Sequence, residues 1–157
     1  MRKVLALLLL CGGCAGDARF NKVWSGLEST ITSPTRVEAF RITASKPDMD
    51  YLKWAETAGP ILLDGPTSKE LAGILLDSKG YYRGPPKACI PTPGVKLRFT
   101  PANGTTVWVY LCFECRILIV YEGQSLRGSD DFDPAAPALA ALVKKLFPKD
   151  PEIQALK

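Results

Sequence analysis

The fold of this chain is decided by residues 95–112, VKLRFTPANGTTVWVYLC. Apolar and basic residues alternate over 95–100, and residues 105–112 are rich in β-branched and aromatic side chains. Both patterns are typical of strands. Between them lies Asn103-Gly104, a dipeptide that favours a hairpin because both of its residues tolerate the backbone conformation of a tight turn. The stretch therefore predicts two antiparallel strands joined by a short loop.

The centre of the turn fixes which residues of the two strands face each other. With Asn103 and Gly104 at that centre, the loop has an even length. It then pairs Phe99 with Trp108, Leu97 with Tyr110 and Val95 with Cys112. We expect this apolar face to pack against helices. Lys96 and Arg98 then lie on the opposite, solvated face, with their aliphatic stems over neighbouring side chains.

Residues outside the hairpin predict further strands. An alternating pattern over 36–43 and apolar runs at 61–63 and 116–121 are typical of strands. A short edge strand is expected at 125–128, after a turn. Residues 48–58 are expected to form one or two helical turns.

Two longer helices are predicted from their start signals. Thr67-Ser68-Lys69-Glu70 has the spacing of a capping box, and the apolar residues after it predict a helix that ends at Gly80. Asp133-Pro134 begins a second helix, whose apolar stripe runs to Phe147. The order of elements predicts an α+β fold: a single compact domain with a mainly antiparallel sheet of about five strands and two main helices on one face.

Composition limits the function classes. The chain has 157 residues, which suits one domain, and its formal net charge of +4 is too small to indicate a nucleic-acid partner. It has no histidine, which excludes Ser-His-Asp and Cys-His catalysis and the HExxH zinc proteases. Glycine-rich phosphate loops are also missing. We therefore expect no cofactor, and a role other than catalysis is favoured.

The N-terminus carries an export pattern. Arg2 and Lys3 precede the apolar run 4–10, which is too short to span a bilayer but suits a signal peptide. The sequence around Cys14 resembles the lipobox of bacterial lipoproteins, in which small residues precede a cysteine that is acylated and becomes the mature N-terminus. The resemblance implies that Cys14 is the lipid attachment site, although Cys11 stands where the pattern has leucine. The alternative is a secretory signal cleaved after Ala18.

These features predict three parts of the chain. Residues 1–13 form a signal peptide, 14–35 a lipid-anchored tether and 36–157 the α+β domain, with an N-terminal element that docks through Trp24 as the alternative to the tether. The residue after the anchor is Ala15, and the sorting rule of enterobacterial lipoproteins then implies the outer membrane, facing the periplasm. The expected partners are the membrane and a protein of the cell envelope.

Three cysteines remain once Cys11 leaves with the signal and Cys14 is acylated: Cys89, Cys112 and Cys115. Thiols outside the inner membrane are kept oxidised, so two of the three are expected to pair, with a stabilisation of about 3 kcal/mol. In an extended strand the Cα atoms of Cys112 and Cys115 would lie about 10 Å apart, beyond the roughly 7 Å limit for a bridge. Cys89 is therefore expected to be one partner, and the other stays open.

Two sharper roles compete with a structural bridge. Cys112-Phe113-Glu114-Cys115 is formally a CxxC redox motif, but it does not begin a helix, and Glu114 opposes thiolate formation. A zinc site would need a carboxylate such as Glu114 or Asp130 beside the three cysteines. The acidic run 129–133 lacks the ligand spacing of a calcium loop. We therefore expect no metal.

The C-terminal half resembles a module of uncharacterised bacterial lipoproteins, and this resemblance implies no activity. The sequence thus predicts a membrane-anchored envelope lipoprotein with a non-catalytic binding or scaffolding domain. The alternative is an envelope thiol-disulfide protein that uses Cys112 and Cys115. The resemblance is carried by residues 88–91, Phe99, residues 112–115, residues 131–134 and residues 146–148.

Overall fold

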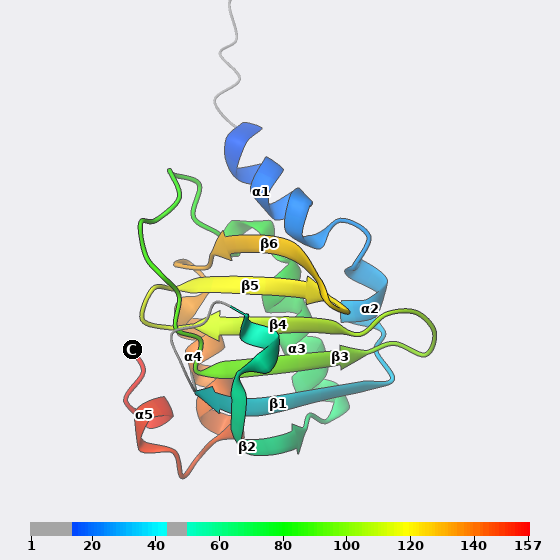
Figure 1. The fold of residues 1–157 in the computed structure, drawn as a ribbon, viewed down its shortest axis with the longest axis vertical. Coiled ribbons are helices and arrows are strands. Elements are labelled where there is room, and N and C mark those ends of the chain that lie inside the picture. The colour runs from blue at the N-terminus through cyan, green and yellow to red at the C-terminus, as the bar shows by residue number, and fades with distance from the viewer. Residues whose placement is uncertain (1–13, 44–49) are drawn as a thin grey trace, which may run out of the picture.

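The structure, a computed structural model, describes residues 14–43 and 50–157. The predicted signal peptide, residues 1–13, lies outside the described residues. Six strands form one antiparallel sheet in the order β2-β1-β3-β4-β5-β6, with the helices α3 and α4 behind it (Figure 1). This confirms the predicted α+β fold. The elements are α1 (Cys14–Trp24), α2 (Glu28–Thr32), β1 (Arg36–Thr43), η1 (Tyr51–Lys53), β2 (Ala55–Leu62), α3 (Gly65–Leu76), η2 (Ser78–Gly80), β3 (Val95–Thr100), β4 (Val107–Cys112), β5 (Ile117–Glu122), β6 (Ser125–Asp131), α4 (Ala136–Leu146) and α5 (Pro151–Gln154).

The main core lies between the sheet and the helices behind it. Helix α3 contributes Leu71 and Leu75, and α4 contributes Leu139 and Leu142, all at most 1% exposed. Asp64 caps the first turn of α3 by accepting a hydrogen bond from the Thr67 N–H at 2.8 Å. The predicted helix over 67–80 thus begins slightly earlier, and it ends at Leu76, before the separate turn η2.

The central hairpin has the predicted strands but a different register. Phe99 pairs with Val107, Leu97 with Val109 and Val95 with Leu111, so the predicted pairs are wrong by one residue. All six side chains are fully buried. An odd loop length is favoured because it places valine and leucine from β4 in the main core. Trp108 and Tyr110 then turn to the opposite face, where they meet basic side chains.

That opposite face is not the solvated surface that the sequence predicted. Phe40, Tyr110 and Tyr121 form a second apolar cluster with Tyr51 of η1, which lies over the front of the sheet (Figure 1). Lys96 Nζ lies 4.8 Å from the centre of the Phe40 ring, close enough for a cation–π contact. The sheet is therefore packed on both faces, by helices behind it and by an aromatic layer in front.

Residues 51–62 also differ from the prediction. Of the expected helical turns over 48–58, residues 48 and 49 lie outside the described residues, and within 50–58 only the three residues of η1 are helical. Residues 55–62 form the edge strand β2 instead of a short strand at 61–63. Residues 55–58 lack an apolar helical stripe, whereas their backbone pairs with β1. Gly59 has a φ of +105°, and a Cβ there would lie 2.7 Å from the Ala39 carbonyl oxygen. Only glycine therefore fits this position.

The N-terminal segment is folded onto the domain. The tether predicted over 14–35 is wrong, because Trp24, Leu27 and Ile31 are each 1% exposed and belong to the main core. The alternative of docking through Trp24 is confirmed. Helix α1 runs beside β6, the edge strand at the end of the sheet opposite β2 (Figure 1). The sequence understated this packing because large apolar residues are few between positions 19 and 35, and all five of them, Phe20, Val23, Trp24, Leu27 and Ile31, pack in or against the main core.

We predict that Trp24→Ala lowers the free energy of unfolding by about 3 to 5 kcal/mol, the usual cost of truncating a large buried aromatic side chain. Urea denaturation measures this change. Lys22→Ala, which removes an exposed side chain from the same helix, is the control and should change it by less than about 0.5 kcal/mol. A Trp24→Ala variant that unfolds at the same urea concentration as Lys22→Ala would show that the segment is a tether.

Candidate functional site

The site is built around the turn between β4 and β5. Residues 113–116 form this turn, and Arg116 closes it with a φ of 55°. The sequence had placed Cys112 and Cys115 in or between extended strands and had begun the next strand at Arg116. The turn instead brings the Cys115 N–H to 3.5 Å from Cys112 Sγ. The spacing argument against a contact between these two cysteines therefore does not hold.

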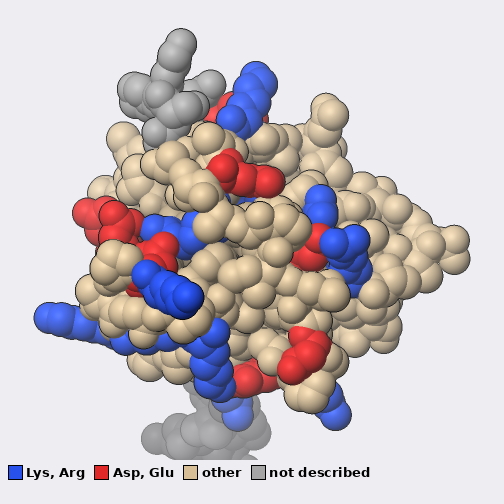
Figure 2. All heavy atoms as spheres, turned by 90° about the horizontal axis from the view of Figure 1, so that it is seen from below, with Lys and Arg blue, Asp and Glu red and all other residues tan. Residues whose placement is uncertain are grey.

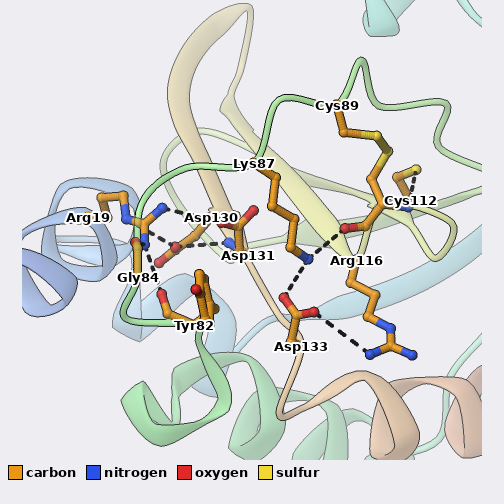
Figure 3. A network of polar contacts seen from close by, with 11 residues as sticks. Arg19, Tyr82, Gly84, Lys87, Cys89, Cys112, Arg116, Asp130, Asp131 and Asp133 are labelled. Atoms are coloured by element: carbon orange, nitrogen blue, oxygen red, sulfur yellow. Dashed lines mark hydrogen bonds and ion pairs between the residues drawn. A yellow bond between two sulfur atoms is a disulfide. The ribbon is translucent and has the colours of Figure 1, made fainter.

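A disulfide joins Cys89 to Cys115, with the Cα atoms 6.3 Å apart (Figure 3). This lies within the usual range for a bridge. The prediction that Cys89 is one partner is confirmed, and Cys115 is the other. The bridge ties the irregular segment 81–94 to the turn. Cys89 is exposed, whereas Cys115 is buried.

Cys112 is a free cysteine, and it is fully buried. Cys112 is the last residue of β4, whereas Cys115 lies in the turn and is bonded to Cys89 of the loop. The Thr92 N–H lies 3.3 Å from Cys112 Sγ, and the Cys115 N–H approaches the same sulfur. Cys112, Cys115 and Ile117 form one buried cluster. The three cysteines predicted as a constellation are thus brought together.

A polar network holds the same loop to α1 and β6 (Figure 3). The guanidinium of Arg19 donates to the carbonyl oxygens of Tyr82 and Gly84 at 2.8 and 2.7 Å. The same group reaches Asp131 Oδ2 at 3.3 Å. Arg19 belongs to α1, so this helix holds both the loop and the edge strand β6 in place.

Lys87 forms the second attachment of the loop. Its Nζ donates to the Cys115 carbonyl oxygen at 2.8 Å and to Asp133 Oδ2 at 2.5 Å. Arg116 lies 3.8 Å from the other oxygen of the same carboxylate. The loop is therefore fixed on both sides of Lys87, by Arg19 before it and by the disulfide after it.

Asp130 is a buried carboxyl beside this network. Its Oδ1 accepts a hydrogen bond from the Asp131 N–H at 2.9 Å, and the Arg19 guanidinium lies 3.8 Å from that oxygen. Its Oδ2 is buried without a hydrogen-bond partner among the described residues. Burial raises the pKa of Asp130, and this effect outweighs the Asp131 N–H and the Arg19 charge, which both lower it.

A cavity of about 640 Å³ lies between the loop, the front of the sheet and α1. Ile119 and Tyr121 of β5 line it, together with Cys89 from the loop and Lys22 from α1. The exposed side chain of Leu126 lies at the same cavity. It combines apolar and charged lining, as ligand sites commonly do.

The sequence missed Arg19 and Lys87 and the role of Asp131. Arg19 and Asp131 lie 112 residues apart, so no local pattern connects them. Asp130 was considered only as a ligand for a metal. No group of three or more His, Cys, Asp or Glu side chains that could hold a metal ion occurs in the described ranges 14–43 and 50–157.

Acidic and basic side chains are interspersed on the face shown in Figure 2, the molecule seen from below. Arg41 forms ion pairs with Asp150 at 2.6 Å and with Glu152 at 2.7 Å. We place the candidate site at the cysteine cluster and its cavity because they bring together the disulfide, a free thiol and a buried carboxyl.

Comparisons with protein-family models, curated proteins and solved structures each found no match. None of the helices that the structure describes is both long and apolar enough to cross a membrane.

Removing the disulfide should destabilise the fold measurably. The bridge closes a loop with a sequence separation of 26, and Cys89→Ser should lower the free energy of unfolding by about 3 to 4 kcal/mol. A thermal melt with and without dithiothreitol should show a drop for the parent and none for the double variant Cys89→Ser/Cys112→Ala, in which Cys115 has no cysteine of the site left to pair with. Cys112→Ala alone, which keeps the bridge, should retain the drop. An equal response of Cys112→Ala and the double variant to the reductant would refute the pairing.

Asp130 should make stability depend on pH. Because its pKa is raised in the folded state, the folded protein holds this proton more tightly than the unfolded chain. The contribution of this tighter proton binding to the free energy of unfolding is fully present below the pKa that Asp130 has in the unfolded chain. It is lost as the pH rises through the pKa that Asp130 has in the folded protein. Asp130→Asn should therefore gain stability relative to the parent from about pH 3 to about pH 7. Urea melts across this range measure the difference. A constant difference for Asp130→Asn would contradict the assignment.

Proposed function

We propose that the protein is a lipid-anchored protein of the bacterial cell envelope whose domain binds a partner and is not catalytic. The observation that carries the proposal is the Cys89–Cys115 disulfide in a chain whose N-terminus resembles a lipobox. Structural disulfides persist in oxidising compartments. The bridge and the export pattern therefore favour the same location, the cell envelope, and Ala15 after the anchor adds the outer membrane, facing the periplasm, through the sorting rule.

The way α1 packs adds a geometric argument. The helix begins at Cys14, and Arg19 already binds the loop and the edge strand. Five helical residues span about 7.5 Å. A lipid on Cys14 would therefore hold the domain against the membrane surface, with β6 and the loop close to it, instead of at the end of a tether.

The cavity supports a binding role. Ile119 and Tyr121 in its lining suit the apolar part of a partner, while the exposed side chain of Lys22 offers a positive charge. The chain contains no histidine, the residue that general acid–base catalysis uses most often. Binding is therefore the role that these residues support best.

The anchor is tested by metabolic labelling with a tagged fatty acid. The parent and Cys11→Ser should carry the label and sediment with membranes, whereas Cys14→Ser should lose both properties because the acylated thiol is gone. A Cys14→Ser variant labelled as strongly as the parent would overturn the anchor. An unlabelled parent with Arg19 as its first residue would instead establish secretion after cleavage at Ala18.

The binding role is tested in the same membranes. A photo-crosslinking residue at Leu126, which is 60% exposed at the cavity, should give a discrete adduct. The same residue at Lys79, an exposed position outside the lining of the cavity, serves as the control. Identical adduct patterns from both positions would contradict a partner at the cavity.

A further inference from the structure

We propose that the three cysteines form an exchange cluster in which Cys112 displaces Cys89 from Cys115. The bridge then joins Cys112 to Cys115, and Cys89 becomes a free, solvent-accessible thiol site for thiol-reactive partners. This inference does not depend on the lipid anchor. It rests on the position of one buried free thiol beside one disulfide.

The turn between β4 and β5 places the nucleophile. Cys112 and Cys115 lie on either side of Phe113-Glu114, and their side chains share a buried cluster with Ile117. The 3.5 Å contact between the Cys115 N–H and Cys112 Sγ fixes this sulfur next to the residue it would attack.

Two backbone N–H groups fix the position of the Cys112 sulfur. The N–H groups of Thr92 and Cys115 lie 3.3 and 3.5 Å from Cys112 Sγ. The sulfur is therefore held between the loop, which contains Thr92, and the turn, which contains the disulfide-bonded Cys115.

The exchange is balanced within the chain. The Cys112 thiol gives its proton to solvent, and its sulfur forms a bond to Cys115 Sγ. The bond between Cys115 and Cys89 breaks, its electron pair leaves on Cys89 Sγ, and this thiolate takes a proton from water. One disulfide and one thiol are present before and after the step, so no external oxidant or reductant is required.

The two end states differ in what the surface offers. In the structure the accessible cysteine, Cys89, is bonded, and the free one, Cys112, is fully buried. After exchange the free thiol is Cys89, which also lines the cavity. The middle of the loop would then be held by Lys87 and no longer by a covalent bond.

The chain offers a direct assay, because trypsin separates the cysteines. Cleavage after Lys87 and Lys96 puts Cys89 in peptide 88–96, whereas cleavage after Arg98 and Arg116 puts both Cys112 and Cys115 in peptide 99–116. The bridge seen in the structure links the two peptides. The exchanged bridge leaves peptide 88–96 free and peptide 99–116 with an internal disulfide, lighter by two hydrogens.

The full chain is incubated in native buffer with N-ethylmaleimide, which traps each thiol that reaches the surface. Uncatalysed disulfide rearrangement takes minutes to hours, and over that time we expect peptide 88–96 to accumulate with maleimide on Cys89 while peptide 99–116 gains its internal bridge. Cys112→Ala, which lacks the nucleophile, should lose this product completely. Maleimide on Cys112 with the two peptides still linked would overturn the proposal, as would equal labelling of Cys89 in the parent and Cys112→Ala.

A second variant tests the geometry independently of the rate. In Cys89→Ser the two cysteines of the turn have no other partner in the domain, and oxidised glutathione should convert them to the internal bridge. Two glutathione adducts, or two free thiols, on peptide 99–116 would show that the turn does not let Cys112 bond to Cys115, and the exchange would be excluded.

Discussion

The bridge between Cys89 and Cys115 is the constraint on which the functional end of the molecule depends. The segment 81–94 contains four prolines and no helix or strand, so its backbone has few hydrogen bonds of its own to hold it. The disulfide fixes it covalently at the turn between β4 and β5. Arg19 and Lys87 then fix it by charge-assisted hydrogen bonds. These three attachments form one wall of the cavity and cover Cys112.

The same attachments connect helix α1 to the edge strand β6 and to the loop. Arg19 joins α1 to β6 and to the loop, and Trp24 buries the end of that helix in the core. A lipid placed at the start of α1 would therefore act on a rigid unit. The position of the domain relative to the membrane would follow from the fold and not from the length of a linker, which is the physical content of the proposed function.

The parts of the fold that are set by local chemistry could be predicted from the sequence. Asn103-Gly104 predicted the hairpin, and the apolar spacing from Leu71 onward predicted α3, although the helix is capped by Asp64 and not by the predicted Thr67. The register could not be predicted, because both faces of β4 are apolar: the choice depends on Trp108 meeting Lys96 and Arg98 across the sheet. The site was predicted only as a set of cysteines. That Cys115 is the cysteine bonded to Cys89 depends on a turn that the sequence pattern did not reveal. The contact between Arg19 and Asp131 has no local signature in the sequence.

The bridge between Cys89 and Cys115 is tested most directly by the redox state of the three cysteines in the cells that make the protein. Acid quenching before lysis fixes this state, and peptide mapping reads it. We expect peptides 88–96 and 99–116 to be recovered joined to each other, with Cys112 reduced. Recovery of Cys89, Cys112 and Cys115 as three free thiols would contradict this expectation, because the chain would then reside in a reducing compartment and its loop would not be tied to the sheet.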